Sequence, residues 1–505
     1  MYNVIDYLEK SAVNFENKTA VIEEDKKISY VELNKYSKMV GSYFATRNIF
    51  KEPIIIFMDK GIDTLISFFG VIYSGCFYTL INSELPEVRI NQIKNTIGSK
   101  YVITDDEHIE LANKYFNDLE VLNIKDLKNN DLDEDAIAIA RSKHIDYDPL
   151  YVNFTSGSTG VPKGVVISHR SVIDFIEQFT TLFNFNEEDL IGNQAPFDFD
   201  VSVKDIFSAI RVGATLVIIP KKYFSNPTML LDYICDNKVT TLTWAVSALC
   251  LVTTFHGLDY KVPTTVNKVL FSGEVMPIKH LRKWMEHLPN TMFVNVYGPT
   301  EITCNCTYHI IDRDRDYEDK IPIGRPFPNE RVILLDENDN EITEPSKSGE
   351  ICVCGTALAL GYYNNELQTS SHFVQNPNVK YYLENIYRTG DLAYFNEFGE
   401  LIFNGRKDFQ IKYLGHRIEL EEIDKAIMKC DEVIRTCTIF EEEKSRLYGF
   451  YIGDIEKKDL SAKLKQELPV FMIPTILVKM DEFPMNKNGK IDRKKLLEIY
   501  KEGKK

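Results

Sequence analysis

The sequence predicts an α/β protein in which a large N-terminal domain of helix-covered sheets is followed by a small C-terminal α+β domain. The chain has 505 residues and exceeds the roughly 250–300 residues at which one hydrophobic core stops growing, so more than one domain is expected. Strand-like runs alternate with helical ones through most of the first 310 residues. That alternation is typical of an α/β architecture.

Short apolar runs bounded by polar residues predict the strands of the large domain. The clearest four are Ile54–Phe57, Tyr101–Ile103, Thr215–Ile219 and Lys268–Phe271. Amphipathic stretches such as Ser225–Asn237 predict helices between strands. The uncharged stretch 64–83 is long enough to span a membrane, but Ser, Gly and Asn interrupt it and no basic flank follows. We therefore expect a buried helix that leads into a buried strand.

The sequence pattern changes near residue 321. Short strand-like runs joined by acidic and glycine turns predict a β-rich subdomain over about 321–407. We assign residues 1–407 to the N-terminal domain and 408–505 to the C-terminal domain. The second domain has strands and helices of its own, predicted at Gln410–Tyr413, Thr436–Phe440, Glu419–Cys430 and Ile491–Tyr500.

Composition limits the classes of function. The net charge of −16 argues against binding to nucleic acid, which needs a basic face. Nine scattered cysteines do not form a secreted disulfide framework. The pairs Cys304-x-Cys306 and Cys352-x-Cys354 lack the spacing of a zinc site, and in a strand each pair would place both thiols on one face. With no apolar segment typical of a signal peptide at the N-terminus, we expect a reducing cytoplasm.

The stretch YVNFTSGSTGVPKGVVISH, residues 151–169, has the composition of a phosphate-binding loop. Its glycines allow close approach of the backbone to an oxyanion, its hydroxyls are donors, and Lys163 adds a positive charge. A P-loop ATPase would place Ser or Thr after the lysine, whereas here Gly164 follows it. The stretch therefore predicts a different class of phosphate-binding site.

Four further motifs follow in order: NVYGPTE at 295–301, YRTGDL at 387–392, GRKDFQIK at 405–412 and NGKIDR at 488–493. Together with the glycine-rich loop, they closely resemble the adenylate-forming superfamily, and the resemblance covers essentially the whole chain. That superfamily includes acyl-CoA synthetases, firefly luciferase and the adenylation domains of nonribosomal peptide synthetases.

The resemblance implies a two-step reaction in one site, with ATP and Mg²⁺ as cofactors. A carboxylate attacks the α-phosphorus of ATP to give an acyl-adenylate and pyrophosphate, and a thiol then attacks the adenylate. Lys490 would enter from the small domain to neutralise charge on the carboxylate and α-phosphate, and Glu301 would hold the metal. Asp408 matches the family's hinge, about which the small domain would rotate after adenylation.

The same resemblance assigns the nucleotide-binding residues. Tyr297 would offer an aromatic face to adenine, Asn295 an amide to its exocyclic amine, and Asp391 a carboxylate to the ribose hydroxyls, with Arg406 beside the same sugar. The β- and γ-phosphates would lie in the loop from Thr155 to Lys163. The full predicted ATP-binding set is Thr155, Ser156, Gly157, Ser158, Thr159, Gly160, Lys163, Asn295, Tyr297, Gly298, Thr300, Asp391 and Arg406.

Two aspartates favour the amino-acid branch of the superfamily. Asp200 lies where members that activate α-amino acids pair a carboxylate with the substrate ammonium, although it could instead cap a helix that begins near Lys204. Asp198 competes with it by proximity. Asp408 stands where carrier-protein-loading members commonly have Asp and acyl-CoA ligases commonly have Lys. An acyl- or aryl-CoA ligase is therefore the disfavoured rival enzyme, and a nucleotide-binding scaffold is the non-enzymatic one.

The resemblance around Asp200 also assigns the residues of the substrate pocket. Its predicted residues are Asp200, Val201, Lys204, Thr243, Leu270, Ser272, Gly273, Val296, Cys304 and Asn305. Lys204 suits an acidic substrate side chain, because a buried ammonium needs a counter-charge or several acceptors. Alternatively, Lys204 extends away and Thr243, Ser272 and Asn305 line a pocket for a small hydroxylated amino acid. The sequence leaves both alternatives open.

Overall, the chain most resembles the stand-alone D-alanine–D-alanyl carrier protein ligases. That resemblance leads us to expect Cys at the position of Ser272 and an apolar residue at that of Lys204, so D-alanine itself is in doubt. No carrier-like segment follows Lys490, and we expect the acceptor to be a separate carrier protein with a phosphopantetheine thiol.

Overall fold

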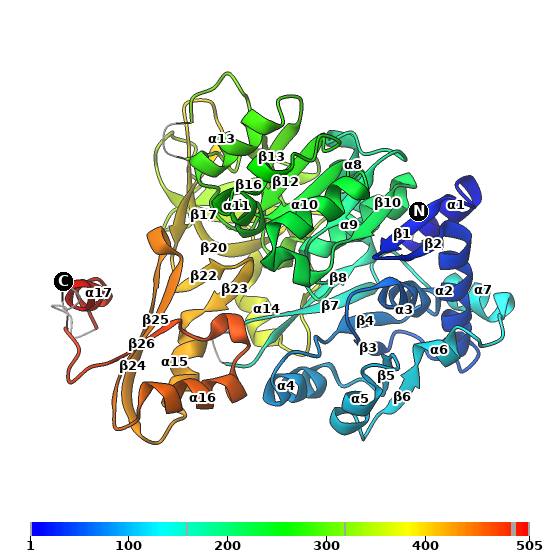
Figure 1. The fold of residues 1–505 in the computed structure, drawn as a ribbon, viewed down its shortest axis with the longest axis horizontal. Coiled ribbons are helices and arrows are strands. Elements are labelled where there is room, and N and C mark those ends of the chain that lie inside the picture. Colours follow the sequence, from blue (N-terminus) through cyan, green and yellow to red (C-terminus); the bar gives the residue numbers. More distant parts are fainter. Residues whose placement is uncertain (1–2, 158–159, 318–319, 486–490, 503–505) are drawn as a thin grey trace. The chain divides into compact units, whose positions relative to one another are not determined.

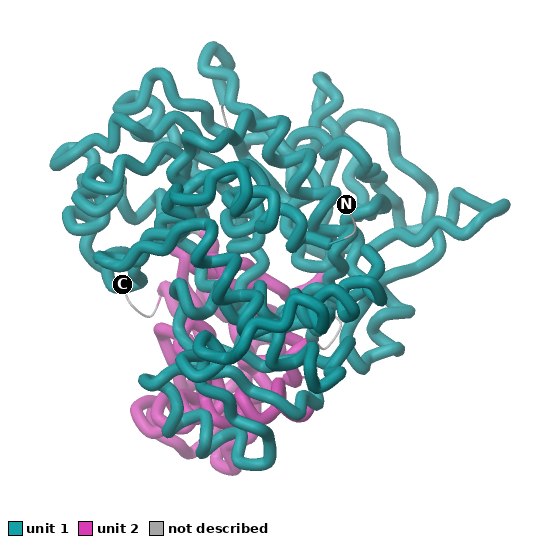
Figure 2. Tube along the Cα trace, turned by 90° about the vertical axis from the view of Figure 1, so that its right-hand side faces the viewer, with its two compact units in different colours: residues 1–83, 96–154, 164–407 teal, residues 84–95, 155–163, 408–505 magenta. Residues whose placement is uncertain are grey.

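The computed structural model describes residues 3–157, 160–317, 320–485 and 491–502. The chain divides into two compact units (Figure 2). The first contains residues 1–83, 96–154 and 164–407, and the second contains 84–95, 155–163 and 408–505. The second unit thus includes the predicted C-terminal domain and two short segments that the sequence analysis assigns to the first domain.

The first unit is organised around two large, mostly parallel sheets (Figure 1). The strand order of one is β15 (Arg325–Pro326), β14 (Thr307–Ile310), β13 (Met292–Tyr297), β12 (Lys268–Ser272), β11 (Thr241–Ala245), β9 (Leu190–Asn193), β10 (Thr215–Ile218), β1 (Thr19–Glu23) and β2 (Lys26–Ser29). The order of the other is β18 (Gly361–Tyr362), β8 (Lys163–Ser168), β7 (Pro149–Thr155), β4 (Phe77–Leu80), β3 (Pro53–Phe57), β5 (Tyr101–Thr104) and β6 (Glu120–Asn123). The predicted α/β fold class is confirmed.

A smaller antiparallel sheet occupies the region in which the sequence predicts a β-rich subdomain. Its strands are β16 (Glu330–Leu335), β17 (Gly349–Gly355), β19 (Phe373–Gln375), β20 (Asn385–Phe395) and β21 (Leu401–Arg406). Cys352 and Cys354 lie in β17 as expected, but Cys304 and Cys306 do not lie in a strand. They belong to the connection between β13 and β14, which turns too tightly for an extended backbone.

Helices of the first unit cover both large sheets. They are α1 (Ile5–Asn14), α2 (Tyr30–Ala45), α3 (Ile62–Tyr73), α5 (Ile109–Tyr115), α6 (Ile124–Leu127), α7 (Glu134–Ser142), α8 (His169–Leu182), α9 (Val201–Val212), α10 (Pro227–Asp236), α11 (Val246–Thr254), α12 (Gly257–Tyr260), α13 (Ile278–His287) and α14 (Glu366–His372). The uncharged stretch 64–83 forms most of α3 and then β4, and both are buried. No helix in the described part of the chain is long and apolar enough to cross a membrane.

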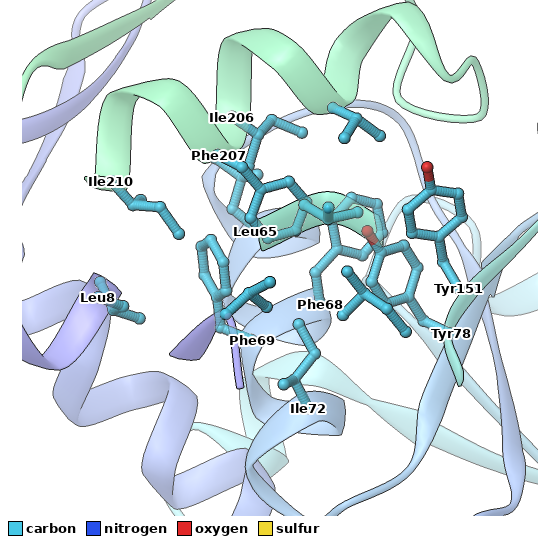
Figure 3. Packing of buried hydrophobic residues seen from close by; sticks show 14 of the residues in the cluster. Leu8, Leu65, Phe68, Phe69, Ile72, Tyr78, Tyr151, Ile206, Phe207 and Ile210 are labelled. Carbon is cyan, nitrogen blue, oxygen red and sulfur yellow. The ribbon is translucent and has the colours of Figure 1, made fainter. Parts of the chain in front are cut away.

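The main hydrophobic core lies where α1, α2, α3, α8 and α9 pack between the two large sheets. Figure 3 shows Phe68 of α3 beside Tyr78 of the second sheet and Phe69 of α3 near Phe207 of α9. The Phe68 ring stacks on Tyr78 with centroids 4.0 Å apart, and Phe69 meets Phe207 edge to face. This packing fixes α9 against the sheets and so fixes the side chains that it carries.

The period-two alternation of β11 and β12 decides which side chains face α9. Leu242, Trp244, Val269 and Phe271 belong to a second core on the opposite face of the sheet, with α10, α11 and α13. Successive side chains of a strand point to opposite faces, so Thr243, Leu270 and Ser272 face α9. Ligands of open parallel sheets bind beyond the carboxyl ends of the strands, which is where Ser272 lies.

A buried ion pair lies at the other end of this sheet, between the first residue of β12 and the residue before β9, two strands that flank β11. The Lys268 ammonium lies 2.6 Å from Asp189 Oδ1, and both side chains are less than a tenth exposed. The hydroxyls of Thr240 and Thr241 donate to the same oxygen at 3.0 and 3.1 Å. Replacing Lys268 with methionine would leave the carboxylate buried without its cation.

We expect Lys268→Met to lower the free energy of unfolding by about 3–5 kcal/mol, as measured by urea denaturation. Lys100 is the matched control, because its pair with Glu52 lies 3.0 Å apart on the surface and the lysine is 67% exposed. Lys100→Met is expected to change the free energy by about 0.5 kcal/mol or less. Equal effects of the two variants would contradict a structural role for the buried pair.

The second unit has its own small sheets and core. Its strands are β22 (Gln410–Tyr413), β23 (His416–Glu419), β24 (Val433–Glu441), β25 (Arg446–Gly453) and β26 (Ile476–Lys479), and its helices are α15 (Leu420–Met428), α16 (Lys457–Glu467), α17 (Arg493–Glu502) and most of α4 (Glu87–Ile97). Ile423 and Ile427 of α15 pack against Leu460 and Leu464 of α16. The unit therefore has the α+β composition that the sequence predicts.

Candidate active site

Helix α9 begins directly after Asp200, at the carboxyl ends of the parallel strands. Asp200 occupies the N-cap position, but its backbone is helical, with φ of −58°, and its side chain makes no capping hydrogen bond. The capping alternative for Asp200 therefore does not hold. Residues four apart on a helix lie on one face, so Lys204 follows Asp200 one turn later on the same side.

Lys204 is completely buried and its ammonium contacts two neutral acceptors. Its Nζ lies 3.2 Å from Ser272 Oγ and 3.4 Å from Asn305 Oδ1. Across the described residues, no carboxylate lies within 4.0 Å of this ammonium. The structure thus brings together three of the predicted pocket residues, and Lys204 points into their cluster instead of away from it.

The loop between β13 and β14 carries Cys304 and Asn305 in a strained backbone. Thr303 and Cys304 have φ of 52° and 77°, in the left-handed region that β-branched and bulky residues rarely adopt. The loop folds back onto Gly298, where an added Cβ would lie 2.5 Å from Asn305 Cα. Glycine in the YGPTE motif is therefore required for the loop to present Asn305 to Lys204.

A buried polar network that the sequence analysis missed lies behind Lys204. Asp205 is fully buried, accepts from Asn193 Nδ2 at 2.8 Å and also accepts from the Thr243 hydroxyl. Lys60 donates to Asn193 Oδ1 at 3.1 Å. Burial raises the pKa of Asp205 to about 7 and lowers the pKa of Lys60 to about 8. The Thr243 hydroxyl, predicted to line the pocket, is therefore occupied by Asp205.

Tyr151 of β7 was also missed. Its hydroxyl is buried and has no hydrogen-bond partner, and Figure 3 shows it directed toward the beginning of α9. Burial raises the pKa of this hydroxyl well above its ordinary value, and nearby Tyr78, Asp200 and Cys304 raise it further. An unpaired buried donor costs about 1–3 kcal/mol. The Tyr151 O–H, close to Asp200, could therefore donate a hydrogen bond to an oxygen of a bound ligand.

A second group of predicted residues surrounds Asp391, which is 2% exposed. The Tyr297 hydroxyl donates to one of its carboxylate oxygens and the Arg406 guanidinium donates to the other. Each carboxylate oxygen has a further lone pair and can still accept from a ribose hydroxyl. Asn295 donates its amide to Pro322 O at 2.8 Å, and its side-chain carbonyl oxygen is an acceptor of the kind that an exocyclic amine needs.

Glu301, in the short helical turn η2 (Thr300–Ile302), is completely buried. The Tyr362 hydroxyl donates to Glu301 Oε1 at 2.7 Å. Tyr362 belongs to β18, so this bond ties the YGPTE turn to the edge strand of the second sheet. Within the described ranges, no group of three or more His, Cys, Asp or Glu side chains forms a metal cage.

The described part of the predicted phosphate-binding loop, Thr155 to Lys163, belongs to the second unit, where its donors contact carboxylates. Gly157 N–H donates to Glu422 Oε2 at 3.2 Å, and Lys163 Nζ lies 3.9 Å from Glu419 Oε1. An added Cβ at Gly157 would lie 2.1 Å from Val161 O, so the loop requires glycine there. Backbone and lysine donors that hold carboxylates have the character needed to hold phosphates.

The remaining predicted residues have varied positions. Val201 begins α9, Leu270 is buried in β12 and Val296 is buried in β13, whereas Gly273 follows β12 with φ of 95°. Asp408 accepts from Gln410 N–H at 3.1 Å. Ser158, Thr159 and Lys490 lie outside the described residues.

Comparison with known proteins explains this arrangement. The model of the family described as "AMP-binding enzyme" matches residues 8–363, more than half of the chain. The chain belongs to the AMP-binding enzyme family. The predicted membership of the adenylate-forming superfamily is thereby confirmed.

Its relatives include peptide synthetases. It is 32% identical to bacitracin synthase 1 of Bacillus licheniformis over 98% of this chain, but spans only 9% of that protein. It is 31% identical to zwittermicin A synthase ZmaJ of Bacillus cereus, over 97% of this chain and 93% of that protein. A solved structure of holo-PA1221, an NRPS protein containing adenylation and PCP domains, superimposes with a TM-score of 0.83 at 23% identity and covers 99% of this chain and 84% of that one.

Proposed function

We propose that this AMP-binding enzyme activates an amino acid as its aminoacyl-adenylate and then transfers it to the phosphopantetheine thiol of a carrier protein. The observation that carries the proposal is Asp200, placed at the start of α9 without a capping role and one turn from Lys204. Peptide synthetases among the relatives and the adenylation and PCP domains of PA1221 support an amino acid as substrate and a carrier protein as acceptor.

In the first step, an oxygen of the amino acid's carboxylate attacks the α-phosphorus of ATP. The bond to the β-phosphate oxygen breaks, and pyrophosphate leaves with the electron pair. Asp391 orients the ribose, and Tyr297 and Arg406 hold the Asp391 side chain in place. Asp200 binds the substrate ammonium. Holding both reactants in a reactive geometry lowers the entropic part of the barrier. Lys490 neutralises the charge that develops on the α-phosphate.

In the second step, the carrier thiolate attacks the acyl carbon, a thioester forms and AMP leaves. We infer that the small domain rotates about Asp408 between the two steps, which withdraws Lys490 and admits the thiol. The nine free cysteines fit a reducing cytoplasm as the place of the reaction.

Glu301 fits a magnesium ion. Mg²⁺ is usually bound through one or two carboxylates together with substrate phosphates, and Glu301 offers one buried carboxylate already oriented by Tyr362. When bound, the ion would neutralise charge on the phosphates.

Pyrophosphate exchange across a panel of amino, fatty and aryl acids tests the proposal. We expect ATP–pyrophosphate exchange with at least one amino acid and none with fatty or aryl acids. Exchange with a fatty or aryl acid alone would indicate an acyl- or aryl-CoA ligase, and no exchange with any acid would indicate a nucleotide-binding scaffold. D-alanine belongs in the panel because of the resemblance to the D-alanine ligases.

The Tyr151→Phe variant tests whether the Tyr151 hydroxyl contributes to binding of the amino acid or to the stability of the fold. Removing an unpaired buried hydroxyl is expected to raise the free energy of unfolding by about 1–3 kcal/mol and to raise the KM for the amino acid by about tenfold. Urea denaturation and pyrophosphate exchange measure the two effects.

Tyr30→Phe is the matched control, because the single O–H of Tyr30 has carbonyl acceptors within reach, Ala209 O at 2.9 Å and Ala214 O at 2.5 Å. That variant is expected to lower the free energy of unfolding by about 0.5–1.5 kcal/mol without changing KM. A Tyr151→Phe protein that is both less stable and unchanged in KM would remove Tyr151 from the site.

A further inference from the structure

We propose that the amino acid activated by this enzyme carries a carboxylate on its side chain, as aspartate and glutamate do, and that Lys204 binds that carboxylate. The inference rests on the proposed function and names its substrate class. Its starting point is the contact between the completely buried Lys204 ammonium and the neutral oxygens of Ser272 and Asn305.

A buried ammonium is costly unless an anion or several acceptors hold it. Lys204 has two acceptors, and an ammonium has three donors. The carboxylate beside it in the sequence, Asp205, directs its two oxygens to Asn193 and Thr243. Residues one apart on a helix do not face each other, so Asp205 lies on a different side of α9. An anion supplied by the substrate would complete the environment of Lys204.

The position of Lys60, the other buried lysine of this region, also supports the binding of a substrate carboxylate by Lys204. Lys60 is linked to Asp205 through Asn193 and also interacts with Asp198, so the acidic groups behind the pocket already have a cation. Asp205 also interacts electrostatically with Lys204, but its two oxygens are hydrogen-bonded to Asn193 and Thr243, so the third donor of the Lys204 ammonium is left for the ligand. Pairing of Lys204 with a substrate carboxylate would leave each buried charge beside an opposite one.

The geometry of α9 matches the spacing of charges in an acidic amino acid. A long helical side chain leans toward the N-terminus of its helix, so Lys204 extends back over the turn that begins at Asp200. An ammonium bound at Asp200 and a carboxylate one or two methylene groups beyond the α-carbon would then meet charges of opposite sign. The unpaired Tyr151 hydroxyl beside Asp200 is a further donor for a substrate oxygen.

A neutral substrate would leave this arrangement incomplete. The methyl group of alanine would lie against a buried ammonium that lacks an anion. The hydroxyl of a small polar amino acid would compete for Ser272 and Asn305, whose oxygens already accept from Lys204. The acidic alternative is therefore the one that the contacts favour.

Pyrophosphate exchange with isosteric pairs tests the inference. We expect the wild-type enzyme to prefer aspartate over asparagine, or glutamate over glutamine, by at least about 100-fold in kcat/KM. Lys204→Met is expected to reduce that preference to about tenfold or less, and Lys204→Arg to retain it. Lys222→Met is the control for charge, because Lys222 is exposed and pairs with Glu24 on the surface. It is expected to keep the wild-type profile.

Calorimetry with the non-hydrolysable sulfamoyl-adenylate analogues of aspartate and asparagine, and of glutamate and glutamine, gives a readout independent of turnover. Tighter binding of an acidic analogue than of its amide would support the inference. A wild-type preference for neutral amino acids would overturn it while the proposed function stands. An unchanged acidic preference in Lys204→Met would overturn the role of Lys204. Absence of exchange with every amino acid would overturn both proposals.

Discussion

Replacing Lys490 with alanine is expected to lower the rate of aminoacyl-adenylate formation by about 10²–10³ while transfer from a supplied adenylate to the carrier thiol stays within about threefold of wild type. The proposed mechanism requires a cation on the α-phosphate only in the first step. In that mechanism, the lysine has no further role once the adenylate has formed and the small domain has rotated.

Single-turnover measurements separate the two steps. Pyrophosphate release reports adenylation, and loss of a synthetic aminoacyl-adenylate in the presence of holo carrier protein reports transfer. Lys487→Ala, three positions earlier in the same basic segment, is the control and should affect neither step. Equal losses in both steps for Lys490→Ala would contradict a mechanism with two conformations.

Asp200→Asn is expected to lower kcat/KM for the amino acid by about 10²–10³, with the KM for ATP unchanged. The substitution keeps the size of the side chain and removes its charge, so the substrate ammonium would be buried without an anion, at a cost of about 3–5 kcal/mol. In the proposed mechanism the nucleotide is held by Asp391, whose carboxylate accepts from Tyr297 and Arg406.

Steady-state exchange with each substrate varied in turn measures this effect. Asp198→Asn is the matched control, since Asp198 lies two residues earlier and was the competing candidate in the sequence. It is expected to change kcat/KM by less than Asp200→Asn. A larger loss in Asp198→Asn would reassign the ammonium site to that residue.

The candidate pocket residues were predicted from the resemblance, and simple periodicities explain why several of them share a face. Thr243, Leu270 and Ser272 share a face of the sheet through the two-residue repeat of β11 and β12, and Asp200 and Lys204 share a face of α9. The motif residues Tyr297, Asp391 and Arg406 come together as the resemblance implied. The shared faces follow from local sequence, whereas the meeting of Tyr297 with Asp391, 94 residues apart, could be expected only from the resemblance.

The missed features depend on contacts between distant segments. Tyr151 and Asp205 are about fifty residues apart, and nothing in the sequence shows that one lacks a hydrogen-bond partner or that the other binds Thr243. The only sign of these two residues in the sequence was a polar group within an otherwise apolar strand or helix. The strand expected at Cys304 and Cys306 was wrong because the backbone at Thr303 and Cys304 is left-handed, which a run of non-glycine residues does not indicate.

A crystal structure with a non-hydrolysable aminoacyl-adenylate analogue tests the anchoring of the amine most directly. With the adenylate ribose on Asp391, the α-ammonium should lie about 3 Å from a carboxylate oxygen of Asp200. An adenylate bound at Asp391 whose ammonium contacts other groups, with Asp200 directed to solvent, would contradict amino-acid activation by this site.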